Sequence, residues 1–153
     1  MKSRTMILGL TIVAGLMAAT PVAVAQTMDW RRLGQDGPFE IAVDVGSFAG
    51  PRTQRVARTA MVSLEESPVP YMVLNVQVDC EARTISALSA VAYNSEGSVL
   101  REGALEPDTA AIEESEATVT LAGAICDGME IEGPAFESVA TFAAWAETRS
   151  IEP

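Results

Sequence analysis

Hydrophobic and polar residues alternate along several segments in the middle of the chain. The clearest alternation runs over residues 71–80, where every second residue is apolar and Cys80 falls in the apolar row. A period of two places successive side chains on opposite faces of a β-strand. Similar patterns, bounded by turns rich in glycine and proline, predict further strands at residues 39–45, 54–64, 84–93 and 98–102.

The connections between these segments are too short for parallel strands. Residues 94–97 read Asn-Ser-Glu-Gly, which is typical of a hairpin turn. A parallel crossover, in contrast, needs about a dozen residues or more. We therefore expect an antiparallel sheet of about five to six strands.

The alternation in residues 39–45 predicts a strand with one buried side and one solvent-facing side. In residues 54–64, Arg58 shares the apolar face, so it either lies past the edge of the core or needs a partner. In the segment 39–45, the predicted core side holds Phe39, Ile41, Val43 and Val45, and the predicted solvent side holds Glu40, Ala42 and Asp44.

After residue 106 the pattern changes to that of a helix. Ser115 is a typical N-cap, and acidic residues close to it oppose the positive end of the helix dipole. Gly128 is placed to end this helix after Asp127. Its expected buried face holds Val119, Ala122, Ile125 and Cys126.

A second helix is predicted from the Gly133-Pro134 pair to about Arg149. This helix would cover the sheet or one of its edge strands. Its apolar stripe holds Phe136, Val139, Ala143 and Ala146, with Phe142 and Trp145 beside it.

The first 25 residues are typical of a secretory signal peptide. A short basic start precedes an uncharged apolar stretch at residues 6–19, and Ala23-Val24-Ala25 has the small-residue pattern of a cleavage site. We expect cleavage between Ala25 and Gln26. The predicted organisation is a signal peptide (1–25), a sheet domain (26–128) and a C-terminal helical extension (129–153). The periplasm is the expected destination, with the cell surface or the medium as alternatives.

Cys80 and Cys126 are the two cysteines of the chain. Exported proteins form disulfides, so we expect these residues to be bonded to each other. Cys80 lies in the core row of the clearest strand and Cys126 on the apolar face of the first helix. The bond would therefore tie the helix to the sheet.

Composition argues against most catalytic chemistry. The full chain has ten basic and 21 acidic residues, no histidine, and lysine only at position 2. Without residues 1–25 the balance is 8 minus 21, or −13. Lack of histidine excludes imidazole catalysis and histidine metal sites, and oxidised cysteines offer no thiolate. The negative charge argues against binding to nucleic acid or anionic lipid. We expect no enzyme, no cofactor and no metal.

Two groups of acidic residues allow a chemical interpretation. Asp44 and Asp79 lie on polar faces of predicted strands and could form a carboxylate pair if those strands were neighbours. Asp127, Glu130 and Glu132 could offer oxygen ligands to calcium, but they lack the alternating ligands of a calcium loop. For Asp44 and Asp79, we favour carboxylates that are solvated or that cap a turn. For Asp127, Glu130 and Glu132, we favour the end of a helix followed by a turn.

Arginines and aromatic residues provide the other candidates. Three arginines lie within residues 52–58, but strand alternation separates Arg55 from the other two. Arg83 is expected to pair with a nearby carboxylate. Trp30 and Tyr93 could anchor a partner protein, although burial under the terminal helix is favoured.

Several short motifs also follow one another in a recognisable order and spacing. They are Trp30, Val43-Asp44-x-x-Ser47, Val78-Asp79-Cys80-x-x-Arg83-Thr84, Tyr93-Asn94-x-x-Gly97-x-Val99-Leu100, and the helix that bears Cys126. Over roughly residues 29–127, this order resembles the surface-adhesin protein E family. The resemblance implies an antiparallel sheet tied to a helix by the disulfide, in a non-enzymatic exported domain. Members of that family attach to host extracellular-matrix and serum proteins.

The chain departs from that family in two respects. No cysteine lies near the predicted cleavage site, so the lipid anchor of a surface adhesin is not expected. The stretch after Cys126 lies outside the resemblance. Three functions stay open: a protein-binding domain, which is favoured, a structural or envelope-maintenance protein without a discrete ligand, and a carboxylate-dependent hydrolase, which is the least favoured.

Overall fold

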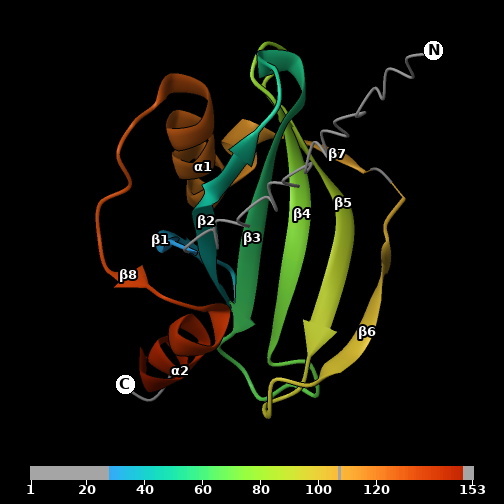
Figure 1. Cartoon of the computed structure of the whole chain (residues 1–153), viewed down its shortest axis with the longest axis vertical. Helices are drawn as coiled ribbons and strands as arrows, with labels where there is room; N and C mark the ends of the chain where they lie inside the picture. Colours follow the sequence, from blue (N-terminus) through green and yellow to red (C-terminus); the bar gives the residue numbers. More distant parts are fainter. Residues whose placement is uncertain (1–27, 107, 150–153) are drawn as a thin grey trace, which may run out of the picture.

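The computed structural model describes residues 28–106 and 108–149. Within these residues the chain forms an antiparallel sheet and two α-helices, as the α+β class requires (Figure 1). The strands are β1 (Trp30–Asp36), β2 (Phe39–Ala49), β3 (Arg55–Ser63), β4 (Tyr71–Asp79), β5 (Thr84–Tyr93), β6 (Val99–Ala104), β7 (Thr109–Ala111) and β8 (Ala135–Phe136). The helices are α1 (Glu116–Asp127) and α2 (Val139–Arg149), and short 3-10 turns cover Arg52–Gln54 and Ile112–Glu114.

The strands follow the order β6-β5-β4-β3-β2-β1-β8, and β7 pairs with the other half of β5. Every pairing is antiparallel, as predicted. The described part has eight strands, so the prediction of five to six was too low. The three strands that were not predicted are β1, β7 and β8. β1 carries little alternation in its sequence, and β7 and β8 are too short to show a period.

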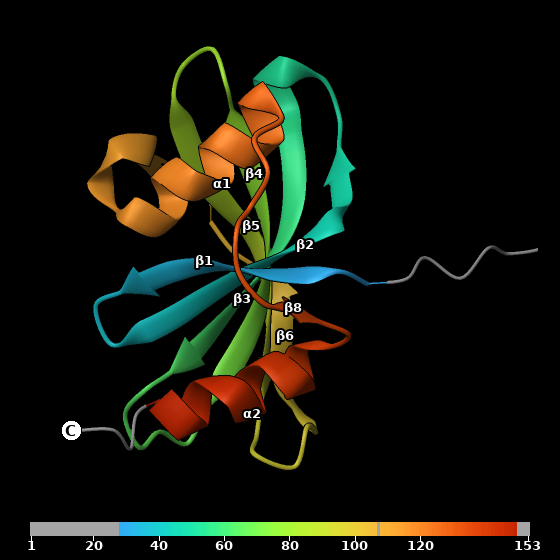
Figure 2. The same ribbon diagram turned by 90° about the vertical axis from the view of Figure 1, so that its left-hand side faces the viewer.

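β2 is buried on both sides, whereas its sequence predicted one solvent-facing side. Ile41 and Val43 pack in the core beneath α1. On the opposite face Ala42 packs in a second core beneath α2, and Glu40 and Asp44 are each only 1% exposed. The two helices thus cover opposite faces of this part of the sheet, with β1 and β2 between them (Figure 2). The polar face of β2 is buried because α2 packs over Ala42 and because arginines pair with Glu40 and Asp44.

α1 begins and ends as predicted. The Ser115 hydroxyl accepts a hydrogen bond from the Thr118 amide at 3.2 Å, and Gly128 ends the helix in a left-handed conformation with φ of 70°. The predicted buried face was wrong at Val119, which is 45% exposed. The buried stripe is rotated toward Leu121, which packs in one core with Leu33 of β1 and Ile41 of β2.

α2 begins at Val139, five residues later than the predicted Gly133-Pro134 start. The chain before it is extended, since β8 pairs with β1. Ser138 then caps the helix by accepting a hydrogen bond from the Thr141 amide at 3.1 Å. The buried face of α2 packs in a core with Trp30 and Tyr71. That face holds Phe142, Ala143 and Ala146.

Neither described helix is long and apolar enough to cross a membrane. Both helices pack over the half of the sheet near β1 to β3. On the α1 side, α1 covers the end of β4 near Val78 and the start of β5 near Ile85. The rest of this face, formed by the other halves of β4 and β5 and by β6, has no helix over it among the described residues (Figure 1). This open face holds the candidate site.

Candidate functional site

The open face of the sheet contains a trough with a volume of about 520 Å³. Its floor is formed by Met72 and Leu74 of β4 and by Ala90 and Ala92 of β5. Met72 pairs with Ala92 and Leu74 with Ala90, so the four side chains share one face. Residues 101–105, in β6 and just after it, form the outer wall. We call this feature the trough.

Small side chains make the trough hollow. Ala90 and Ala92 leave space above β5 that larger residues would fill. Gly103 faces Ala90 across the β5–β6 pair, and a Cβ atom built on Gly103 would meet nothing within 4 Å. The backbone of Gly103 lies outside the left-handed region, so this glycine is not required by a turn. Because Gly103 has no side chain, the outer wall of the trough does not project over the floor at this position.

A second apolar cavity, of about 130 Å³, lies between the sheet and α1. Leu74 lines both this cavity and the trough. Leu121 of α1 and Ile41 of β2 lie on its other sides. The apolar surface of the trough therefore continues under α1.

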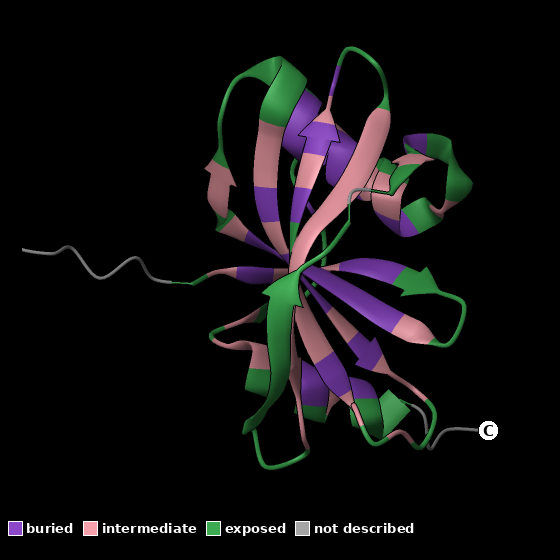
Figure 3. Cartoon of the chain, turned by 90° about the vertical axis from the view of Figure 1, so that its right-hand side faces the viewer, coloured by how far each residue is buried: buried purple, intermediate pink, exposed green. Residues whose placement is uncertain are grey.

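β6 forms one edge of the sheet. Its inner side pairs with β5, and no described strand pairs with its outer side. β6 is exposed along its length (Figure 3). Its six residues include the apolar Val99 and Leu100. Leu105, just after the strand, is also exposed. An exposed edge next to an apolar trough is typical of a protein-binding surface.

Exposed charges surround this edge. Arg101 pairs with Ala92 and so lies on the trough face, while Glu102 pairs with Val91 and lies on the opposite face. Three more exposed acids flank the strand. None of the five charged residues forms an ion pair with another described residue; they are Glu96, Arg101, Glu102, Glu106 and Asp108.

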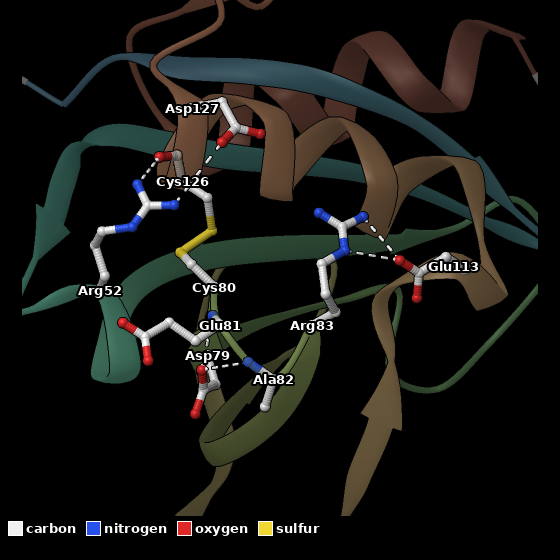
Figure 4. Close-up of a disulfide and its surroundings, with 9 residues drawn as sticks. All are labelled: Arg52, Asp79, Cys80, Glu81, Ala82, Arg83, Glu113, Cys126 and Asp127. Atoms are coloured by element: carbon white, nitrogen blue, oxygen red, sulfur yellow. Dashed lines mark hydrogen bonds and ion pairs between the residues drawn. A yellow bond between two sulfur atoms is a disulfide. The ribbon is translucent and has the colours of Figure 1, made fainter.

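The predicted disulfide is present between Cys80, just after β4, and Cys126 of α1 (Figure 4). The two Cα atoms are 5.6 Å apart. Arg52 donates a hydrogen bond to the Cys126 carbonyl at 2.5 Å and lies 4.0 Å from the Asp127 carboxylate. The end of α1 is thus attached to the sheet by a covalent bond and by an arginine.

Asp79 and Arg83 have structural roles near the disulfide (Figure 4). The Asp79 carboxylate accepts hydrogen bonds from the Glu81 and Ala82 amides at 2.9 and 2.8 Å, so it caps the β4–β5 turn. Arg83 pairs with Glu113 at 2.8 Å, as expected for an arginine with a nearby carboxylate. The hydrogen bond from Arg83 lowers the pKa of the Glu113 carboxyl below its usual value.

Asp44 does not form a carboxylate pair with Asp79. Asp44 lies on β2 and Asp79 at the end of β4, with β3 between the two strands. Asp44 is ion-paired with Arg58, and it accepts a hydrogen bond from the Asp29 amide at 3.2 Å. Arg58 therefore has a partner within the structure, which was one of the two arrangements that the sequence allowed.

Two other predicted clusters are also not assembled as ligand sites. Of the arginines in residues 52–58, Arg52 contacts the end of α1 and Arg58 contacts Asp44. Arg55 does not join them, and its buried Nε has no hydrogen-bond partner among the described residues. Glu130 and Glu132 are exposed beyond the end of α1. No group of three or more potential metal-binding residues occurs in the described ranges.

The two predicted aromatic anchors lie on the α2 side of the sheet, away from the trough. Trp30 is buried in the core under α2, which confirms the favoured prediction of burial under the terminal helix. Tyr93 is half-buried and stacks on Tyr71, with ring centroids 5.0 Å apart. Ala25 and Gln26 lie outside the described residues.

The trough was not found from the sequence. The only signal was the row of small residues in segment 84–93, and small residues in a strand are equally compatible with close packing under a helix. The ion pair of Glu40 with Arg32 was also missed, because the partners come from different strands. A comparison of the chain with known proteins adds no guidance: no family model, curated protein or solved structure matches it significantly.

Proposed function

We propose that this chain is a non-enzymatic exported protein that binds another protein at the trough. The observation that carries the proposal is the trough itself, an apolar hollow of about 520 Å³ beside an exposed edge strand. Apolar surface of this kind is costly to leave in water and marks contact sites in soluble proteins. The motif order that resembles the surface-adhesin protein E family supports the same class of function.

Export is part of the proposal. The disulfide between Cys80 and Cys126 is compatible with an oxidising compartment, as is the signal-like start of the sequence. The periplasm is the proposed location. Adhesion to host proteins, as in the resembled family, would require release or display at the cell surface.

The two other functions fit the structure less well. A purely structural envelope protein would have a uniformly polar surface, whereas this one has an apolar trough. A carboxylate-dependent hydrolase would need two acids facing each other across a cleft at about 5–9.5 Å. Asp44 and Asp79 instead lie on strands separated by β3, and each is engaged by its own partners.

Site-specific photocrosslinking tests the proposal. A photoreactive residue is placed at Arg101, on the trough face, in the full chain expressed in intact cells. A matched control carries it at the exposed Glu132, beyond the end of α1. We expect crosslinked adducts from position 101 that are absent from position 132. Gly103→Leu, which fills the trough from an uncrowded position, should weaken them.

Two results would contradict the proposal. One is a lack of adducts at position 101 both in cells and with purified envelope and matrix proteins. The other is an equal set of adducts at positions 101 and 132, which would indicate random collision rather than a defined surface.

A further inference from the structure

We propose that the outer edge of β6 accepts an extended segment of the partner as an additional strand, and that this segment alternates aliphatic and basic residues. The inference rests on the proposed function and specifies the partner's chemistry. Strand addition uses the unpaired amide and carbonyl groups of an edge for affinity, and the neighbouring side chains for specificity.

The backbone of β6 is suited to strand addition. Its six residues span about 20 Å and include neither proline nor lysine, which commonly protect edge strands. The irregularity in its pairing with β5 lies near Leu100, at the start of the strand. From Arg101 to Ala104 the pairing with β5 is regular. An incoming strand would therefore meet a straight edge over this part.

The charges around β6 indicate the sign of the partner's charge. Residues 95–108 contain one arginine and four acidic residues, so this segment has a net charge of −3. The described residues have little positive charge left to neutralise it. Six of the eight arginines after residue 25 are already in ion pairs; they are Arg31, Arg32, Arg52, Arg58, Arg83 and Arg149. Basic side chains of a partner would supply the missing counter-charge.

The two faces of the edge define the alternation. On the trough face, Gly103 has no side chain, so an aliphatic residue of the added strand beside it can reach toward Ala90. On the opposite face lies Glu102, whose neighbour in the added strand would be basic. Because side chains alternate between faces, one strand satisfies both requirements.

A second copy of this chain fits the edge poorly. Two copies would bring two equally acidic rims together. If two copies of β6 paired antiparallel about a twofold axis at residue 101, Arg101 would lie opposite Arg101. An axis at residue 102 would place Glu102 opposite Glu102. Like charges opposite each other destabilise a sheet. The charge pattern therefore favours a different, cationic chain.

The test uses the full exported chain and labelled, end-blocked octapeptides. The probe alternates valine and lysine, and its control alternates valine and glutamate. Binding is measured by fluorescence anisotropy, and hydrogen exchange of the backbone amides locates the contact. We expect the lysine peptide to bind, the glutamate peptide not to bind, and the amides of residues 99–104 to become protected.

A pair of charge-matched variants separates local recognition from general attraction. Glu102→Lys should weaken binding of the lysine peptide by about tenfold, because an opposite-charge pair across the strands becomes a like-charge pair. Glu132→Lys makes the same change in net charge at a distant exposed site and should leave the affinity within about twofold. Both residues are exposed, so both variants are expected to fold.

Three results would overturn the inference: equal binding of the two peptides, equal weakening by the two variants, or protection confined to residues outside β6. If position 101 still gives crosslinked adducts when any of these is seen, the trough binds a protein of different chemistry and the proposed function stands. If the crosslinks are also absent, both proposals fail.

Discussion

Arg32 on β1 forms a two-pronged ion pair with the buried carboxylate of Glu40 on β2. The Nε–Oε2 distance is 2.8 Å and the Nη2–Oε1 distance is 3.1 Å. Arg149, at the end of α2, lies 3.9 Å from the same carboxylate. Both guanidinium groups also lie over the ring of Trp145, at 5.8 and 5.1 Å. The charge of Glu40 is thus compensated partly by the helix that buries it.

Replacing Arg32 with alanine should destabilise the protein strongly. The substitution leaves the Glu40 carboxylate buried with only the more distant Arg149 near it, and an uncompensated buried charge costs about 3–5 kcal/mol. The free energy of unfolding is measured by urea denaturation.

Arg31→Ala is the matched control for this substitution. Arg31 is the neighbouring residue in β1, and both side chains of its ion pair with Asp29 are partly exposed, unlike that of Glu40. Its loss should have a much smaller effect. Equal losses for the two variants would show that the burial of Glu40 does not determine the energy of its ion pair.

Loss of the Cys80–Cys126 disulfide should lower the thermal midpoint. The bond closes a loop with a sequence separation of 46. In the loop-entropy model such a loop is worth about 4 kcal/mol, which corresponds to roughly 15 °C for a domain of this size. Calorimetry with and without reductant, and on a Cys80→Ser/Cys126→Ser double variant, measures the shift. An unchanged midpoint, or two reactive thiols in the native exported protein, would refute the assignment.

The rotation of α1 can be tested with two alanine substitutions two residues apart. Leu121 is buried against the sheet, so Leu121→Ala should cost about 2–5 kcal/mol. Val119 is exposed, so Val119→Ala should change the stability by less than about 0.5 kcal/mol. The sequence pattern had placed Val119 on the buried face. A large loss of stability in Val119→Ala would instead support the helix orientation predicted from the sequence, with Val119 on the buried face.

Local signals explain the parts of the fold that could be predicted. The limits of β5, the cap at Ser115 and the end of α1 before Gly128 all follow from the residues themselves. Strand alternation and helix capping act over a few residues, so a short stretch of sequence contains all the necessary information.

Long-range contacts explain most of what was missed. β1 reads as a polar segment, and it is a strand because β2 and β8 pair with its two sides. Glu40 and Asp44 read as solvent-facing, and they are buried because α2 and two arginines from other strands cover and neutralise them. The trough depends on the absence of a covering helix within residues 28–106 and 108–149, which a strand's own sequence does not encode.

Tyr71 should make the stability of the protein sensitive to alkaline pH. Burial raises the pKa of the Tyr71 phenol above its ordinary value of about 10, and the neighbouring Tyr93 raises it further. Well below pH 10 the phenol is protonated in both the folded and the unfolded chain. Between pH 10 and the raised pKa, only the unfolded chain releases this proton. The free energy of unfolding should therefore fall as the pH rises, by at most about 1.4 kcal/mol per pH unit from this residue.

Tyr71→Phe removes the titrating group and keeps the stacked ring, so it should flatten this decline. Urea denaturation of both proteins between pH 8 and about 11 measures the slopes, starting from the region where Tyr71 is neutral. If the Tyr71→Phe variant loses stability as steeply as the native protein, another group controls the alkaline transition. An equal slope would also mean that burial of Tyr71 beneath α2 does not penalise its ionised form.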